Sequence, residues 1–232
     1  MVMKLELKLK FSRAADARFL YTSALILLPC ALLCVAKYGS GSSLELKFLT
    51  VLIAMLLGSF VEVPVYTLTT KSPKFTEKEL ELLKKIFGVV TAEGGGGRKH
   101  SSTVTLNLGG FFLPVAFSIY LMRECPVLEV ATLTLLITVI TFFISETTGG
   151  VGVVVPSYAG IFAIPMGFIL CRESAAPLIF TSATLGIILG VTFKLLSLKE
   201  GEEGSPLLSI GGAGNFPAIF IIGLLTLLVA CF

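Results

Sequence analysis

Seven apolar runs, each long enough to cross a lipid bilayer as a helix, constrain this chain more than any other feature of its sequence. Crossing about 30 Å of hydrocarbon takes about 20 helical residues. The runs predict an all-α integral membrane protein with about seven transmembrane helices, in a single domain over residues 1–232. The fifth run is the weakest, because its glycine-rich entry is also compatible with a re-entrant segment. The runs cover residues 19–36, 48–68, 103–122, 127–144, 153–170, 176–196 and 213–232.

Composition agrees with a lipid-embedded chain and narrows the partners. Only 14% of the residues are charged and 55% are hydrophobic, whereas a soluble domain usually carries about a quarter charged residues. The net charge of +3 is small and dispersed, so nucleic acid is not an expected partner and the lipid bilayer is. A single histidine and no Cys-x-x-Cys pair leave any metal or cofactor unknown.

The distribution of positive charge predicts the orientation in the membrane. Cytoplasmic connections of membrane proteins are enriched in lysine and arginine. Most of the 18 such residues fall before the first run, between the second and third runs, or after the sixth. We therefore expect a multi-pass protein of the cell membrane whose N-terminus is cytoplasmic.

Two segments outside the runs carry patterns of their own. Residues 1–18 begin with the segment 1–11, in which charges stand at positions 4, 6, 8 and 10 with apolar residues between them. This alternation is typical of a half-buried strand. The 67–102 connection contains a capping box at Thr76 and Glu79, a short helical pattern and then β-branched residues. These segments predict a small cytoplasmic β element that could dock a protein partner. The alternative is a solvated loop, which the four glycines at 94–97 favour.

A pair of glycines stands near the start of three runs, and a proline follows each pair. Glycine loosens the backbone and proline removes a donor, so these helix starts are expected to be irregular. At membrane depth such irregularity is tolerated where protein buries it or where it lines a cavity. Free amides at helix starts on one membrane face would favour an anion, whereas small residues also allow close helix packing. The pairs are Gly109-Gly110, Gly149-Gly150 and Gly211-Gly212, and the prolines are Pro114, Pro156 and Pro217.

Strongly polar residues inside the runs all fall in the expected cytoplasmic half. Asn107 and Asn215 are also explained as helix caps, Glu146 as the end of a helix, and Lys194 as a lysine reaching the headgroups. Glu62 is harder to explain structurally, because a carboxyl at membrane depth is costly and is by default a functional hypothesis. Two carboxylates would repel an anion unless a proton or cation joins it. The candidate ligand-binding residues are Glu62, Asn107, Gly109, Gly110, Glu146, Gly149, Gly150, Gly211, Gly212 and Asn215.

Four motifs, at residues 58–66, 104–110, 150–156 and 209–216, carry a resemblance. In this order they resemble an uncharacterised family of prokaryotic multi-pass membrane proteins, a domain of unknown function, from about residue 45 onward. The family pattern implies an acid in the sixth and in the seventh run, where Thr192 and Pro217 stand here, and an asparagine where Glu62 stands. An aspartyl-protease dyad, in which two acids share a proton, is therefore not supported in this chain.

Three functional interpretations follow. A carrier or binder of a small polar or anionic solute comes first, from the interrupted helix starts and Glu62. A structural, sensory or assembly subunit of the membrane is the alternative. An intramembrane enzyme comes last, because the sequence shows no GxSxG or HExxH motif and no catalytic residue can be named.

Overall fold

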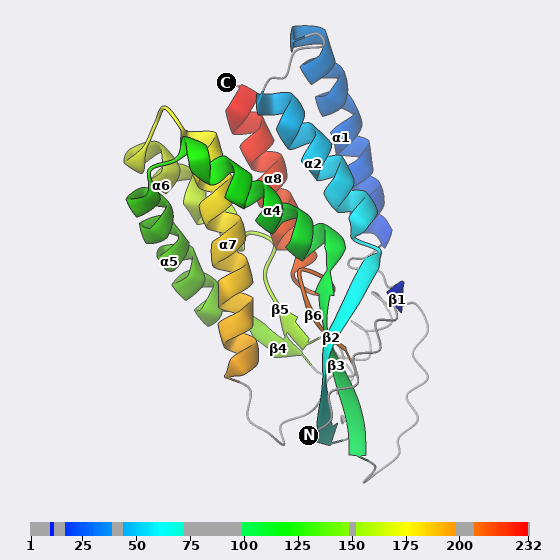
Figure 1. Ribbon diagram of the computed structural model, residues 1–232. Helices are drawn as coiled ribbons and strands as arrows, with labels where there is room; N and C mark the ends of the chain where they lie inside the picture. Colours follow the sequence, from blue (N-terminus) through cyan, green and yellow to red (C-terminus); the bar gives the residue numbers. More distant parts are fainter. Residues whose placement is uncertain are drawn as a thin grey trace.

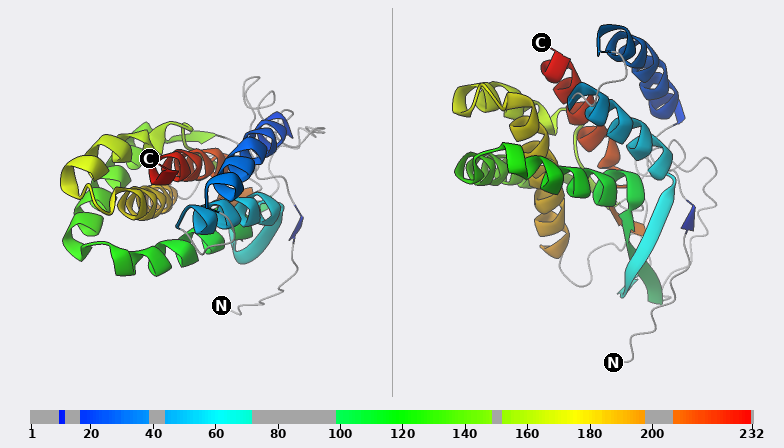
Figure 2. Two further views of the ribbon diagram at one scale, coloured as in Figure 1. Left: turned by 90° about the horizontal axis from the view of Figure 1, so that it is seen from above. Right: turned by 45° about the horizontal axis from the view of Figure 1, so that its top comes forward.

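The structure is a computed structural model, and it describes residues 10–11, 17–38, 44–71, 99–148, 152–197 and 207–231. Helices form a bundle, and the strands gather toward one end of it (Figure 1). Two further views show the same arrangement (Figure 2). The seven α-helices of the described part are α1 (Ala17–Tyr38), α2 (Leu44–Gly58), α4 (Leu113–Leu121), α5 (Val127–Ile144), α6 (Ala163–Leu170), α7 (Ala175–Leu196) and α8 (Phe216–Cys231). Short π or 3₁₀ turns are η1 (Leu108–Phe112), η2 (Met122–Glu124) and η3 (Ala159–Phe162).

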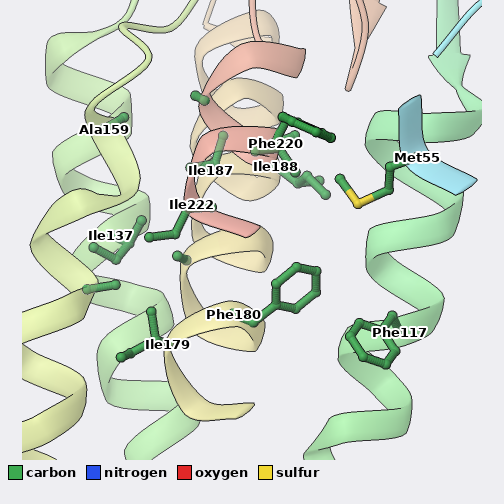
Figure 3. Packing of buried hydrophobic residues seen from close by; sticks show 14 of the residues in the cluster. Met55, Phe117, Ile137, Ala159, Ile179, Phe180, Ile187, Ile188, Phe220 and Ile222 are labelled. Carbon is green, nitrogen blue, oxygen red and sulfur yellow. The ribbon is translucent and has the colours of Figure 1, made fainter. Parts of the chain in front are cut away.

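Helix α7 forms the middle of the hydrophobic core. Its residues are buried from Ala175 to Thr184, and five further buried positions follow before Thr192. The helix contacts α4, α5, α6 and α8. Phe180 packs edge-to-face against Phe117 of α4 and Phe48 of α2, with ring centroids 5.3 Å and 5.4 Å away. Figure 3 shows Phe180 and Phe117 from close by, among other buried residues of the core. Aromatic edge contacts of this kind add to the stabilisation from apolar burial.

Two glycines let α7 approach α5 closely. A side-chain carbon added at Gly186 would lie 2.6 Å from Cβ of Ile137, and one added at Gly190 would lie 2.6 Å from Cβ of Thr141. The two glycines are four residues apart, so they lie on the same helix face. Small residues at this spacing allow helix backbones to pack at short distance.

The expected helices at 127–144 and 176–196 are confirmed by α5 and α7, which are the two described helices long and apolar enough to cross a membrane. Helix α7 is mostly buried inside the protein, whereas α5 leaves much of its surface outside. Large apolar side chains are exposed on α5 and elsewhere, among them Val127, Leu135 and Phe143. Exposed apolar surface of this extent marks contact with lipid or with another protein.

A four-stranded sheet includes residues of the second and third apolar runs, which were expected to be helical. It contains β1 (Lys10–Phe11), β2 (Val61–Lys71), β3 (Lys99–Asn107) and β6 (Leu207–Ile210), in the order β1-β2-β3-β6. Strands β1, β2 and β3 are antiparallel neighbours, and β6 runs parallel to β3. A separate hairpin pairs β4 (Glu146–Thr148) with β5 (Gly152–Val154).

The expected second and third spans are therefore each part helix and part strand. Helix α2 ends at Gly58, and the rest of the run 48–68 belongs mainly to β2. The run 103–122 begins in β3 and turns helical at Leu108. Alternate valines favour a strand after Gly58, and Pro64 would cost a helix about 3 kcal/mol. In the sheet, the register between β2 and β3 shifts between Pro64 and Tyr66, as expected where proline supplies no donor.

The remaining expectations were met in part. In the fifth run, η3 and α6 give an apolar helical segment over Ala159–Leu170, shorter than the ~20 residues needed to cross. The seventh run is helical only from Phe216. Strand β1 pairs with β2, but residues 1–9 and the expected helix after Thr76 lie outside the described residues. The β element is larger than expected, because it also includes β6, whose last two residues begin the 209–216 motif.

Candidate functional site: a buried carboxylate centre

Strand register brings four polar side chains to one face of the sheet. Glu62 of β2 stands opposite Asn107 of β3, and Thr105 stands opposite Ser209 of β6. Side chains two positions apart on a strand point the same way, so Thr105 and Asn107 share the face that Glu62 and Ser209 reach. All four are buried, and Glu62, Thr105 and Asn107 are fully so. We call these four residues the Glu62 centre.

Neutral donors surround the carboxylate of Glu62. The Thr105 hydroxyl donates to Oε2 at 2.7 Å, and the Asn107 amide donates to Oε1 at 3.0 Å. The Ser209 hydroxyl lies 2.9 Å from Oε1 and 2.8 Å from Oε2. Hydrogen bonds to an ionised carboxylate are stronger than those between neutral groups. The three donors therefore offset part of the cost of burying Glu62.

Asn107 combines this contact with the role of a helix cap. Its Nδ2 also donates to the carbonyl of Ser59 at 2.8 Å, and its Oδ1 accepts from the backbone of Gly110 at 2.9 Å. The last bond caps η1, the π turn that begins at Leu108. The capping explanation for Asn107 is thus correct, and the same amide also holds Glu62.

Asn215 lies next to the centre. Its Nδ2 donates to the carbonyl of Ser209 at 3.0 Å. The side chain is fully buried, and its Oδ1 has no hydrogen-bond partner among the residues that the structure describes. Because an acceptor faces Nδ2, turning the amide over would set two acceptors against each other. The unpaired atom is therefore the oxygen.

The first and third glycine pairs meet beside the centre. A side-chain carbon at Gly109 would overlap the carbonyl oxygen of Met55 in α2, and one at Gly110 would overlap the carbonyl oxygen of Gly211. One at Gly212 would overlap both Ser209 Oγ and Glu62 Oε1. Gly211 also has a φ of +78°, which side chains rarely adopt. Close backbone contact thus requires glycine at 109, 110 and 211, and close side-chain contact requires it at 212, which agrees with the packing explanation.

The second glycine entry is only partly visible. Gly149 and Gly150 lie outside the described residues. After them, the backbone amide of Val155 donates to the carbonyl of Gly214 at 2.9 Å, which ties this entry to the loop before α8. Glu146 is exposed on β4, opposite Val154. It is not among the groups that bond to Glu62.

The Glu62 carboxylate is bonded through uncharged groups. Among the side chains that the structure describes, no lysine, arginine or histidine contacts it. The β1–β2 register sets Lys10 opposite Glu62. No second carboxylate bonds to Glu62 within the described residues. Lys194 lies elsewhere, where it donates to the carbonyl of Phe142 at 3.3 Å near the end of α5.

Sequence reasoning missed Thr105, Ser209 and Ser59. All three are small neutral residues that look unremarkable within apolar or β-rich segments. The detectable signal was the alternation of Thr105 and Asn107, which marks a strand with a polar face. This alternation does not by itself identify Ser209, which is 147 positions from Glu62 in the chain and is placed beside it by the strand register.

Comparison with protein families places the chain. A family model described as a protein of unknown function, DUF1614, matches residues 56–229. The chain therefore belongs to this family, which confirms the resemblance to a domain of unknown function. Comparison with curated proteins and with solved structures gives no match.

Proposed function

We propose that this chain is a multi-pass protein of the cell membrane, with a cytoplasmic N-terminus, that binds a small polar solute at the Glu62 centre and carries it. Two observations support the membrane part of the proposal. Helices α5 and α7 are long and apolar enough to cross, and large apolar side chains are exposed on several helices. Lipid is a partner that such a surface suits.

The observation that carries the proposal is the burial of Glu62 among neutral donors where helices give way to strands. Two residues separate the end of α2 from the start of β2, and β3 leads directly into η1. Interrupted helices of this kind form the solute and ion sites of many carriers. A buried carboxylate costs several kcal/mol even when it is well bonded, and an intramembrane acid is by default a functional candidate.

The contacts also bear on the chemistry of the solute. The sequence suggested an anion at the converging helix starts. The carboxylate of Glu62 itself occupies the point where Gly212 and Ser209 meet. An anion bound there would face this negative charge, so it would need an accompanying proton or cation. Neutral polar and cationic solutes need no such compensation.

A carrier must open its site to water, and this can be measured at Glu62. The full-length protein in detergent is treated with a water-soluble carbodiimide and an amine, and modified peptides are quantified by mass spectrometry over time. Exposed Glu146 serves as the internal control and should react first. We expect Glu62 to react more slowly but to completion, because the carrier cycle exposes it. An unmodified Glu62 after complete reaction of Glu146 would reject the carrier function.

A structural or assembly role is the second candidate, and one observation favours it. The hydrogen bonds of the centre join the end of α2, strand β3 and strand β6 through Ser59, Asn107 and Ser209. Such a network can fix a single packing of these segments. A protein partner would dock through residues 67–102. Co-purification with the intact chain, lost when 72–98 is replaced by a short glycine-serine linker, would support this role.

A further inference from the structure

We propose that the Glu62 centre, extended to Asn215, holds a small monovalent cation of about the size of Na⁺. This inference deepens the proposed function and rests on the centre being a ligand site. It starts from the fully buried Oδ1 of Asn215, for which the described part of the chain offers no hydrogen-bond partner.

A buried acceptor without a partner is unusual and costly. More than nine in ten buried polar groups find a partner, and leaving one unpaired costs about 1–3 kcal/mol. The orientation of the Asn215 amide is fixed by its bond to the Ser209 carbonyl. Its free oxygen thus adjoins the residue whose hydroxyl contacts both oxygens of Glu62.

The hydroxyls of the centre add acceptors. Thr105 and Ser209 each have one hydroxyl proton, and each directs it at Glu62. Their oxygens keep free lone pairs. Carboxylate, hydroxyl and amide oxygens are the donor atoms that hard cations prefer. The oxygens available here are those of Glu62, Thr105, Ser209 and Asn215.

The charge of the site favours a monovalent ion. Within the described residues, the centre contains a single carboxylate, that of Glu62. Ca²⁺ sites commonly use several carboxylates, and Mg²⁺ keeps much of its bound water. The structure describes no cluster of three or more His, Cys, Asp or Glu that could hold a metal. By register Lys10 stands opposite Glu62, so the inference relies on the free Asn215 oxygen and not on a missing basic neighbour.

The local backbone holds Asn215 beside Ser209 and Gly212. The carbonyl of Gly212 accepts from the amides of Asn215 and Phe216 at 3.1 Å and 2.9 Å. These bonds close a tight turn over residues 212–216. Gly212 packs against Ser209 Oγ and Glu62 Oε1 at one end of the turn, and Asn215 bonds Ser209 at the other.

The test is the thermal midpoint of the full-length protein in detergent as NaCl replaces choline chloride at constant ionic strength. Binding to the native state raises the midpoint with the logarithm of ligand concentration. We expect a saturable rise of several degrees with Na⁺ and none with choline. Asn215→Leu and Glu62→Gln should remove the rise, whereas Glu146→Gln should keep it. If the Asn215→Leu protein does not fold, Asn215→Ser and direct ²²Na⁺ binding to the purified protein replace it.

An unchanged midpoint of the wild type in Na⁺ would overturn the proposal, and so would an equal rise in the Asn215 variant. The result is separable from that of the carrier proposal. A Na⁺ response together with an unreactive Glu62 would support a cation that stabilises a static centre. A reactive Glu62 without a Na⁺ response would support a carrier of another solute.

Discussion

Asn107 and Glu62 face each other across strands β2 and β3, and the Asn107 amide donates a 3.0 Å hydrogen bond to Glu62 Oε1. The same side chain caps the π turn that starts at Leu108. A single amide therefore fixes both a buried carboxyl group and the start of the helical segment that leads into α4. Asn107 therefore links the centre directly to this helical segment.

Replacing Asn107 with alanine should lower the free energy of unfolding by about 2–4 kcal/mol. The change removes the donor to the Ser59 carbonyl, one of two donors to Glu62 Oε1, and the acceptor of the Gly110 amide. The matched control is Thr132→Ala, whose exposed hydroxyl bonds only its own helix at Leu128 and should change stability by less than about 0.5 kcal/mol. Denaturant titration in detergent measures both. Equal effects of the two changes would show that the Asn107 bonds contribute little.

Alanine at Gly110 should be far more damaging than alanine at Gly160. The added carbon at Gly110 meets the backbone carbonyl of Gly211, which cannot move away, whereas the one at Gly160 lies 3.0 Å from the side chain of Ile222. Overpacking of this sort costs about 1–3 kcal/mol and more where backbone must shift. Thermal midpoints of the two variants give the comparison. A Gly160 variant that is the less stable one would contradict the close approach at Gly110.

Cys125 should react slowly with maleimides near neutral pH. Burial, together with the nearby charge of Glu124, raises the pKa of its thiol from 9.0 to about 11. Only the thiolate is reactive, so the rate should grow about tenfold per pH unit from pH 8 to 10 without levelling off. The measurement uses a variant that keeps Cys125 as its single cysteine, with the unfolded protein as control. A plateau at or below pH 9 in the folded protein would contradict the burial of this thiol.

The same shift has a consequence for stability. In the unfolded chain the Cys125 thiol ionises at its ordinary pKa of 9.0, whereas in the folded protein it stays protonated up to about pH 11. The contribution of Cys125 to folding is therefore complete below pH 9 and declines between pH 9 and 11. Cys125→Ser should weaken this alkaline decline. The urea midpoint between pH 8 and 10.5 measures it.

Single cysteines should report the predicted membrane topology. In the seven-span arrangement Ser102 faces the cytoplasm, and Ser42 and Glu124 face the outside. A membrane-impermeant maleimide applied to intact cells should label cysteines at 42 and 124 and spare one at 102. Inverted vesicles should give the reverse pattern. Labelling of 42 and 102 from the same side would refute the arrangement.

Apolar length alone predicted the helices that cross the bundle without interruption. The run 127–144 coincides with α5. Neither of its ends contains a strand-favouring pattern like those in the runs 48–68 and 103–122. The runs at 48–68 and 103–122 mix helix and strand, and an apolar average does not separate the two. Residue type alone singled out Glu62, Asn107 and the first and third glycine pairs as candidates, since each is costly in an apolar segment. Thr105 and Ser209 depended on strand register, which no local pattern encodes.

The parallel pairing of β3 with β6 determines when, during synthesis, the Glu62 centre can form. Helices α4, α5, α6 and α7 lie between Glu62 and Ser209 in the chain. The hydroxyl of Ser209 therefore bonds Glu62 across a sequence separation of 147 residues. During synthesis, the carboxyl group emerges long before its last donor, and contacts this distant form slowly. A nascent chain therefore holds an incompletely bonded acid until Ser209 has been made, so this centre can assemble only after α4, α5, α6 and α7 have been synthesised.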